Sequence, residues 1–285
     1  MADEWRRYLA QQIELGGAEV VLGRTVGRAD RRAVSVERKS PPDEEVLSPS
    51  DGLTTGELDR QPARPSARPP VRPSAWKKGA PPIPGPGLAV ESPSHALGDE
   101  LVALKTLDAV AERIRTTYCC GLCPSRINAV PGHGDENARL VLVGEGPGAN
   151  EDAQGKPFVG QAGNLLNGIL EAIEVPRTSV YITNIVKCRP PQNRKPLPDE
   201  VAACIPYLHR QLDIIRPKVI LTLGSTAAEA MLRVRKSLGE LRNKVHTYNG
   251  IPLVVTYHPA ALLRNPNWKK PTWDDVRIVR QLLDR

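Results

Sequence analysis

The chain has 285 residues, and its charge is uneven: residues 1–100 carry 14 Lys or Arg against 15 Asp or Glu, whereas residues 101–285 carry 25 against 17. The basic excess of the second part favours a polyanionic partner such as nucleic acid. No apolar run reaches the roughly 20 residues of a membrane-spanning helix, which argues against a membrane protein. Five cysteines without the spacing of a disulfide framework indicate a cytoplasmic protein with reduced or metal-bound thiols.

Residues 1–98 are predicted to form an extension outside the folded domain. The first residues, MADEWRRYLAQQIEL, lack the apolar core of a secretory signal, and residues 4–22 fit a short amphipathic helix. Residues 41–93 hold 13 of the 28 prolines and little periodicity, which predicts a disordered linker with polyproline character. Its PxxP spacings also fit SH3-like grooves, so docking of a partner stays an alternative.

From residue 99 onward, apolar runs alternate with helical patterns. Strands are expected at 139–143, 179–186, 218–223 and 252–257, and helices at 99–117, 161–174, 198–215, 225–235 and 272–284. Strands that alternate with helices predict parallel pairing and helices on both faces of the sheet. The sequence therefore predicts one domain over residues 99–285, with a three-layer α/β/α fold and a central, mainly parallel four-stranded sheet.

A glycine-rich stretch, Val143–Gly163, follows the first of these strands. Glycine lets the backbone approach a ligand closely, and the carboxyl end of a strand is where open α/β sheets bind ligands. Phe158, the only Phe in the chain, lies among these glycines rather than in an apolar run. We expect its ring to be poorly placed for a core and well placed to stack on a flat ligand. A long surface turn is the structural alternative.

Four cysteines form a set, with Cys120 and Cys123 at a C-x2-C spacing and Cys188 and Cys204 at the two ends of a basic, proline-rich loop. Four thiolates suit zinc or an iron–sulfur cluster, and the spacing does not distinguish them. Cys119 is assigned no ligand role, because adjacent cysteines in a tight turn rarely bind the same ion. On chemistry alone, the choice between Cys119 and Cys120 stays open.

Two further polar residues follow predicted strands on the same rim. Asn184 offers one donor group and one acceptor on a planar head, which suits the edge of a base, although a turn cap is the plainer role. His258 begins the segment HPAALLRNP after the last strand. Within this segment, Leu262, Leu263 and Arg264 resemble an apolar wedge beside a base, which suits insertion into a duplex.

Three segments together, GEGPGANEDAQGKPFVGQAG, ITNIVKCRPPQNRKP and HPAALLRNP, resemble the family 4 uracil-DNA glycosylases, the iron–sulfur branch of that superfamily. The resemblance runs from about Thr117 to the carboxyl terminus and includes the four cysteines. It implies a [4Fe–4S] cluster with a structural role on Cys120, Cys123, Cys188 and Cys204. It also implies hydrolysis of the bond between uracil and deoxyribose in DNA.

The same resemblance implies individual roles. Phe158 would stack on uracil, Asn184 would pair with its N3–H and O4, and Glu151 would crowd C5 against thymine. His258 would face O2, where charge develops as the bond breaks. Gly146 stands where the best-known branch has an aspartate, so Glu145 and nearby backbone would position the water. DNA contacts without sequence preference are expected from Lys187, Arg189, Arg194, Lys195, Leu263 and Arg264, and also from Lys269 and Lys270.

Two other functions remain as alternatives. One is a protein that binds or covalently traps uracil-DNA with little turnover, as a relative does through a histidine in an inserted loop. The loop RPPQNRKPLP has no histidine here, which favours turnover. The other is a zinc-stapled domain that only binds nucleic acid. A monomer is expected, and the extension is a candidate contact for repair or replication partners.

Overall fold

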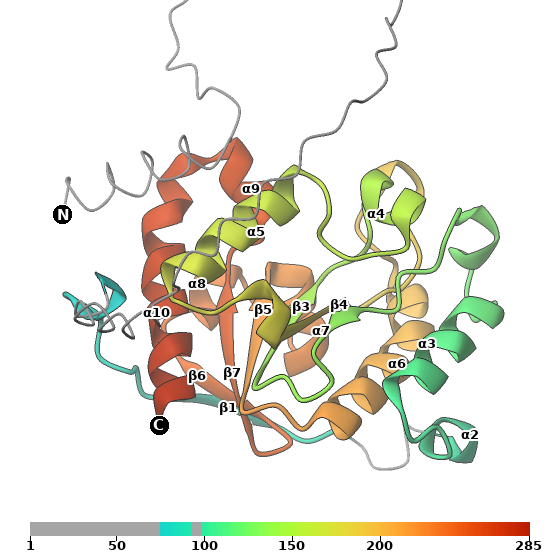
Figure 1. Ribbon diagram of the computed structural model, residues 1–285, viewed down its shortest axis with the longest axis horizontal. Coiled ribbons are helices and arrows are strands. Elements are labelled where there is room, and N and C mark those ends of the chain that lie inside the picture. The colour runs from blue at the N-terminus through green and yellow to red at the C-terminus, as the bar shows by residue number, and fades with distance from the viewer. Residues whose placement is uncertain (1–74, 93–97) are drawn as a thin grey trace, which may run out of the picture. The chain divides into compact units, whose positions relative to one another are not determined.

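A computed structural model describes residues 75–92 and 98–285, which belong to one compact unit, Pro73–Arg285 (Figure 1). Its seven-stranded sheet has the order β1-β6-β7-β5-β3-β4-β2. The strands are β1 (Pro86–Val90), β2 (His133–Gly134), β3 (Leu140–Gly144), β4 (Val180–Asn184), β5 (Val219–Leu223), β6 (Val245–Tyr248) and β7 (Ile251–Thr256). The four predicted strands, β3, β4, β5 and β7, lie side by side and parallel, so their carboxyl ends meet along one rim.

Helices cover both faces of the sheet, which confirms the predicted three layers. The α-helices are α2 (Asp99–Val102), α3 (Leu107–Thr116), α4 (Ala149–Gln154), α5 (Gln161–Ala172), α6 (Pro198–Ile215), α7 (Ser225–Leu232), α8 (Leu238–Leu241), α9 (Pro259–Arg264) and α10 (Lys269–Asp284). Short 3-10 helices are η1 (Ala75–Lys77), η3 (Cys123–Ser125), η4 (Arg177–Ser179), η5 (Pro191–Asn193) and η6 (Pro266–Trp268). None of the described helices is long and apolar enough to cross a membrane.

Alternate residues of each strand feed two separate cores. In β3, Leu140 and Leu142 pack with α5 and α10, whereas Val141 and Val143 pack with α6 and α7. This follows from the period of two along a strand, which sends successive side chains to opposite faces. Because both faces are covered, the strands are continuous apolar runs, which is the feature that made them predictable.

The predicted helix over 99–117 is two helices in the structure. α2 ends at Val102, and Thr106 then caps α3, its hydroxyl accepting from the Ala109 N–H at 3.2 Å. Threonine favours a cap over a helix interior, because its side chain competes for backbone donors. The apolar period of three and four continues across the break, which is why periodicity alone missed it.

The folded unit begins earlier than predicted. Residues 75–92 were expected to belong to the linker, yet β1 pairs in parallel with β6 at the edge of the sheet. The Arg277 guanidinium and the Gln281 amide of α10 donate to the carbonyls of Lys78 and Pro81, at 3.2 and 2.9 Å. Proline is tolerated here because an edge strand leaves one side of its backbone unpaired. The predicted helix over 4–22 and the linker before residue 75 lie outside the described residues.

Candidate active site

The six residues predicted to bind the base or to position the attacking water line one cavity of about 780 Å³. The cavity opens where the four parallel strands end, as expected for an α/β sheet. The structure thus brings together segments that are far apart in the chain, from the ends of β3, β4 and β7. These residues are Glu145, Gly146, Glu151, Phe158, Asn184 and His258.

Asn184 ends β4 and presents an unpaired acceptor. The residue is 1% exposed, and its buried Oδ1 atom has no hydrogen-bond partner among the described residues. An unpaired buried acceptor costs about 1–3 kcal/mol, so one in a cavity wall indicates a ligand that donates to it. Gly144, its partner across β3 and β4, makes room, because a Cβ there would overlap Oδ1 and lie 3.0 Å from the Phe158 ring.

Phe158 is more buried than its surroundings in the sequence indicated. Its ring is 6% exposed and belongs to the core beside Leu165 and Leu166, although it also lines the cavity. The ring centre lies 5.4 Å from that of His258. The backbone of Phe158 has φ of +53°, a conformation that costs free energy for a residue with a Cβ. Strain of this kind persists only where surrounding contacts hold it.

Glu151 supplies those contacts. One carboxylate oxygen accepts from the N–H groups of Val159 and Gly160 at 2.9 and 3.1 Å, and the other accepts from Gly148 at 3.2 Å. The side chain therefore fixes the backbone on both sides of α4 and immediately after Phe158. This anchoring role was missed from the sequence. The predicted contact of Glu151 with C5 of the base stays a prediction.

His258 is a neutral hydrogen-bond donor in this geometry. Its Nδ1 accepts from the Ala260 N–H at 3.2 Å, at the start of α9. Burial, with a smaller effect of the Arg264 charge, lowers the pKa of His258 to about 4. A neutral imidazole whose Nδ1 accepts a hydrogen bond carries its proton on Nε2. His258 thus offers an N–H in the cavity without a positive charge.

Glu145 and Gly146 form the wall that follows β3. The Glu145 carboxylate is half-buried and has no hydrogen bond or ion pair with the other described residues. At Gly146, a Cβ would lie 2.8 Å from Cγ2 of Val186, so even a small side chain requires a shift there. The structure therefore explains why glycine occupies this position, and Glu145 is the carboxylate nearest to it along the chain.

Lys187 does not have the role predicted for it. It was expected to contact DNA phosphates, but it is 1% exposed. Its ammonium donates to the Thr183 hydroxyl at 2.6 Å, the Asn184 carbonyl at 2.8 Å and the Gln211 side-chain oxygen at 2.8 Å. Burial lowers the pKa of Lys187 to about 7. The neighbouring basic loop suggested a surface position, whereas the chain turns inward directly after β4.

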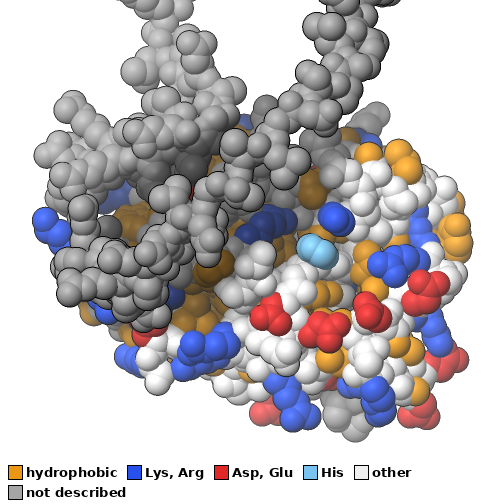
Figure 2. Space-filling view, viewed as in Figure 1, with side chains coloured by type: hydrophobic (Ala, Val, Ile, Leu, Met, Phe, Trp, Pro, Cys, Tyr) orange, Lys and Arg blue, Asp and Glu red, His pale blue; other side chains and the backbone are white. Residues whose placement is uncertain are grey.

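The other predicted DNA contacts lie at the surface, several of them in pairs. Arg194 makes a two-pronged ion pair with buried Glu200 at 2.6 and 2.9 Å, and Lys195 pairs with Glu229 at 3.1 Å. Arg189 donates to Asn193 at 2.8 Å. On the face in Figure 2, Lys and Arg side chains alternate with Asp and Glu. The basic side chains visible on this face therefore do not form one continuous patch.

The predicted wedge is divided between core and surface. Leu262 is 1% exposed and packs inside, whereas Leu263 is 47% exposed. Arg264, next along α9, is exposed and lines the cavity. Only Leu263 and Arg264 are therefore available for contact with DNA at this edge.

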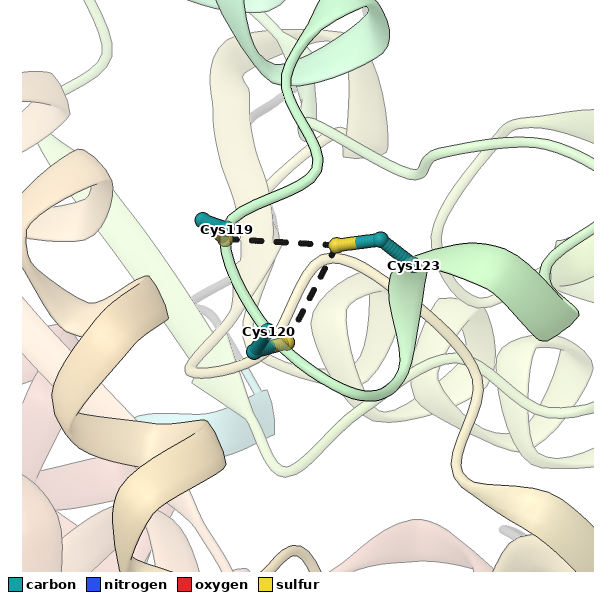
Figure 3. A group of neighbouring side chains, drawn as sticks. All are labelled: Cys119, Cys120 and Cys123. Atoms are coloured by element: carbon teal, nitrogen blue, oxygen red, sulfur yellow. Dashed lines mark hydrogen bonds between the residues drawn. The ribbon is translucent and has the colours of Figure 1, made fainter.

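All five cysteines gather in one cluster. The Cys123 sulfur lies 4.0 Å from that of Cys119 and 3.9 Å from that of Cys120, and the three side chains point toward one another (Figure 3). The Cys188 sulfur lies 3.6 Å from Cys123, and Cys204 packs with them. The structure thus joins the four predicted ligands. It also brings Cys119 into the group, where contact with Cys204 and burial raise the pKa of the Cys119 thiol.

The surroundings of the cluster suit thiolates. The Lys187 N–H donates to the Cys204 sulfur at 3.2 Å, and the Arg126 guanidinium donates to that of Cys188 at 3.3 Å. Burial raises the pKa of Cys188 to about 12, so a bound metal is what would ionise this thiol at neutral pH. The grouped thiols can share one metal centre, and their chemistry fits zinc or an iron–sulfur cluster.

The fold is that of an α/β/α protein with a cavity where its parallel strands end. Residues 131–281 match the family model described as the Uracil DNA glycosylase superfamily, and the chain belongs to this superfamily. The type-4 uracil-DNA glycosylase of Saccharolobus solfataricus is 44% identical over 189 residues, which cover 63% of this chain and 88% of that protein. That of Thermotoga maritima is 45% identical over 161 residues, covering 56% and 84%.

A second branch of the superfamily is more distant. The type-5 uracil-DNA glycosylase of Pyrobaculum aerophilum is 33% identical over 156 residues, covering 47% of this chain and 66% of that protein. The two type-4 proteins are both more similar to this chain and more fully covered than this type-5 protein. The resemblance drawn from the three sequence segments is therefore confirmed.

Proposed function

We propose that this protein hydrolyses the N-glycosidic bond of deoxyuridine in DNA, releases uracil and leaves an abasic site, the opening step of base-excision repair. The observation that carries the proposal is the unpaired Oδ1 of Asn184 in a cavity shared with Phe158 and His258. Membership of the superfamily and the similarity to type-4 enzymes support the same reaction. DNA is accordingly the substrate.

Uracil is recognised by the pattern of hydrogen bonds on its edge. The Oδ1 atom of Asn184 accepts from N3–H, and its amide donates to O4. Cytosine presents the opposite pattern, an acceptor at N3 and a donor at C4, and leaves both groups of Asn184 mismatched. Phe158 stacks on the ring, and Glu151 crowds C5 against the methyl group of thymine. The nucleotide leaves the helix to reach these side chains.

Bond cleavage relies on stabilising the leaving group. The C1′–N1 bond breaks with its electron pair going to uracil, and negative charge develops on O2. The Nε2–H of neutral His258 donates to O2 and binds this charge more strongly than it binds the substrate. Removing one donor of this kind typically costs about 10²–10³-fold in rate. Water positioned by Glu145 and the backbone around Gly146 adds to C1′, and its proton passes through solvent to the departing uracil anion.

The thiol cluster holds a metal centre, and we assign a [4Fe–4S] cluster to Cys120, Cys123, Cys188 and Cys204. Thiolate donors with N–H groups directed at the sulfurs suit such a group. When bound, the cluster serves as a staple without taking part in the reaction. The chain itself contributes the basic loop between Cys188 and Cys204, which the staple closes beside the cavity.

Contacts to DNA are assigned to the partly exposed Arg189 and to the exposed Arg194, Lys195, Leu263 and Arg264. Phosphate contacts of this kind carry no sequence preference and weaken with salt. We further propose a monomer that works in the cytoplasm, where its thiols stay reduced or metal-bound. The extension before residue 75 is proposed to contact repair or replication partners.

The test is a uracil-containing oligonucleotide treated with the protein and then with alkali. The proposal expects strand cleavage at uracil, stoichiometric free uracil and no cleavage of matched thymine or cytosine strands. A persistent covalent adduct with little free uracil would favour a trapping protein instead. Binding without either product would leave only a nucleic-acid-binding domain. Iron and acid-labile sulfide in the purified protein would support the cluster, whereas one equivalent of zinc would contradict it.

A further inference from the structure

An aromatic stack stands at the mouth of the cavity, beside the residues assigned to uracil. Trp268, the last residue of η6, lines the cavity together with Tyr257 and Arg264. The Trp268 side chain is 37% exposed, although tryptophan is usually well covered. None of the steps proposed above uses it.

The stack is rigid because its layers support one another. The rings of Trp268 and Tyr257 are parallel within 9°, with centres 4.9 Å apart. The Arg242 guanidinium lies 4.7 Å from the centre of the Tyr257 ring. Arg242 is itself held by buried Asp275, through two hydrogen bonds of 2.8 and 3.0 Å. Trp268 is therefore a fixed platform anchored to the core through three successive layers.

We propose that Trp268 stacks on the base of the nucleotide that flanks the extruded uracil. This rests on the proposed function, because extrusion leaves the neighbouring base without a stacking partner. Every base presents a π-face, so such a platform suits DNA of any sequence. Arg264, exposed on the same rim, supplies the charge that an adjacent phosphate complements. The ligand class is thus an unstacked nucleobase with its phosphate.

The test measures binding of a labelled, uracil-free single-stranded oligonucleotide by fluorescence anisotropy. Trp268→Ala is expected to raise Kd about 5- to 100-fold, the range for loss of one base–aromatic stack, and Trp268→Phe to recover most of it. Ile127→Ala is the matched control, since Ile127 is 72% exposed and lies outside the cavity lining. A smaller effect is expected for duplex, where bases are already stacked.

A Kd for Trp268→Ala within twofold of wild type on single strands would overturn the proposal. Equal losses for Trp268→Ala and Trp268→Phe would also contradict it, because a ring of either kind can stack. The result of this binding experiment does not depend on whether the proposed glycosylase activity is found. If the wild-type protein released no uracil, the comparison of Kd values on uracil-free DNA would still decide the role of Trp268.

The buried residue Lys187 lies between the cavity residue Asn184 and the thiol cluster. Its three N–H donors meet three neutral acceptors, one of which is the main-chain carbonyl of Asn184. The acceptors are anchored in turn: the Thr183 hydroxyl and the Gln211 amide both donate to the Pro131 carbonyl, at 3.0 and 2.8 Å. Buried hydrogen bonds therefore hold the carboxyl end of β4 in place.

The same residue reaches the thiol cluster. The main-chain N–H of Lys187 donates to the Cys204 sulfur at 3.2 Å, and Cys188 follows directly in the chain. The main-chain carbonyl of Lys187 accepts from the Val130 N–H at 2.8 Å. Lys187 is thus hydrogen-bonded to the thiol cluster through its backbone N–H and to the Asn184 carbonyl through its side-chain ammonium.

The geometry points to Lys187 as a positioning residue that transmits the fixed geometry of the cluster to Asn184. This too rests on the proposed function. In Lys187→Met, which keeps length but removes the donors, we expect kcat to fall at least tenfold and binding of free uracil to weaken. The slope of log Kd against log salt for uracil-free DNA should not change. Arg189→Met is the matched variant. The magnitude of its slope of log Kd against log salt should fall by about one, which corresponds to the loss of one phosphate contact.

Thr183→Val removes one acceptor of the ammonium and provides a milder test if Lys187→Met folds poorly. It should lower uracil affinity in the same direction while the metal content stays unchanged. A salt slope for Lys187→Met that falls like that of Arg189→Met would overturn the assignment, since it would indicate a phosphate contact. Unchanged kcat and uracil affinity in both Lys187→Met and Thr183→Val would overturn it as well.

Discussion

The base cavity and the thiol cluster are joined by the short segment 184–188, because Asn184 lines the cavity and Cys188 belongs to the cluster. The two regions are nevertheless built in opposite ways. The cavity takes its groups from the ends of adjacent strands, and it leaves an acceptor of Asn184 unpaired. The cluster takes its sulfurs from segments off the sheet, and each sulfur contacts another thiol or an N–H. An unpaired group is held ready for a ligand, whereas a fully contacted cluster holds the chain together.

Because of this difference, we expect substitutions in the cavity and substitutions in the thiol cluster to have different effects. Changes in the cavity should reduce the rate while the fold stays stable, because the groups removed contribute little to stability there. Changes in the cluster should first release metal and destabilise the loop after β4, and only then reduce the rate.

The largest effect is expected from the cavity. His258→Ala and Asn184→Ala should each lower kcat by about 10²–10³-fold, because each removes a group that we propose to contact the base in the transition state. Since Asn184 Oδ1 is unpaired, its loss should leave Tm within about 3 °C of wild type. Single-turnover kinetics and thermal denaturation on the same preparations measure both. A large fall in Tm with Asn184→Ala would contradict the separation.

A single methyl group should act almost as strongly. In Gly144→Ala, the new Cβ would overlap Oδ1 of Asn184 and press on the Phe158 ring, so uracil excision should fall at least tenfold. Gly239→Ala is the matched control, because a Cβ there meets no atom within 4 Å. Steady-state rates for the two variants make the comparison. Equal activity in both would show that the crowding around Asn184 is not needed.

The cluster should respond in stability and metal content. Cys188→Ala is expected to lose most of the bound metal and to lower Tm by roughly 5 °C or more, because a ligand of the staple is removed. Cys119→Ala, by contrast, should keep its metal if Cys119 is not a ligand. Metal analysis and thermal melts report both. Loss of metal from Cys119→Ala with retention in Cys120→Ala would exchange the two residues in the ligand set.

The smallest effect concerns pH. Since the pKa of His258 is lowered to about 4, the side chain stays neutral at pH 5, and excision should show no inflection between pH 5 and 6.5. Protonation is easier in the unfolded chain, so the stability that His258 contributes is present above pH 6.5 and lost as pH falls toward 4. The Tm of His258→Gln should therefore fall less than that of wild type over this range. An inflection in rate near pH 6.5 that His258→Gln removes would contradict a lowered pKa.

The parts of the site that could be predicted are those that follow strand ends. Asn184 and His258 come directly after apolar runs, and parallel strands bring such residues to one rim. The four cysteines were predicted for a similar reason, since their chemistry indicates a shared partner despite distance in the chain. The parallel core of the sheet was predictable because buried strands are continuous apolar runs.

What was missed depends on contacts that no local pattern contains. Lys187 adjoins a basic loop, and only the folded structure reveals three buried acceptors around its ammonium. Glu151 was assigned to C5 of the base, and its hydrogen bonds to the backbone N–H groups after Phe158 are seen only in the folded structure. The edge strand β1 lies in a proline-rich stretch and is defined by its pairing with β6. In each case the partner is supplied by tertiary structure.

The most direct test of the central claim is a crystal structure of the protein with free uracil bound. We expect N3 of uracil within hydrogen-bond distance of Asn184 Oδ1, the ring stacked on Phe158, and O2 facing Nε2 of His258. Uracil bound elsewhere, or bound in the cavity with Oδ1 still unpaired, would contradict it.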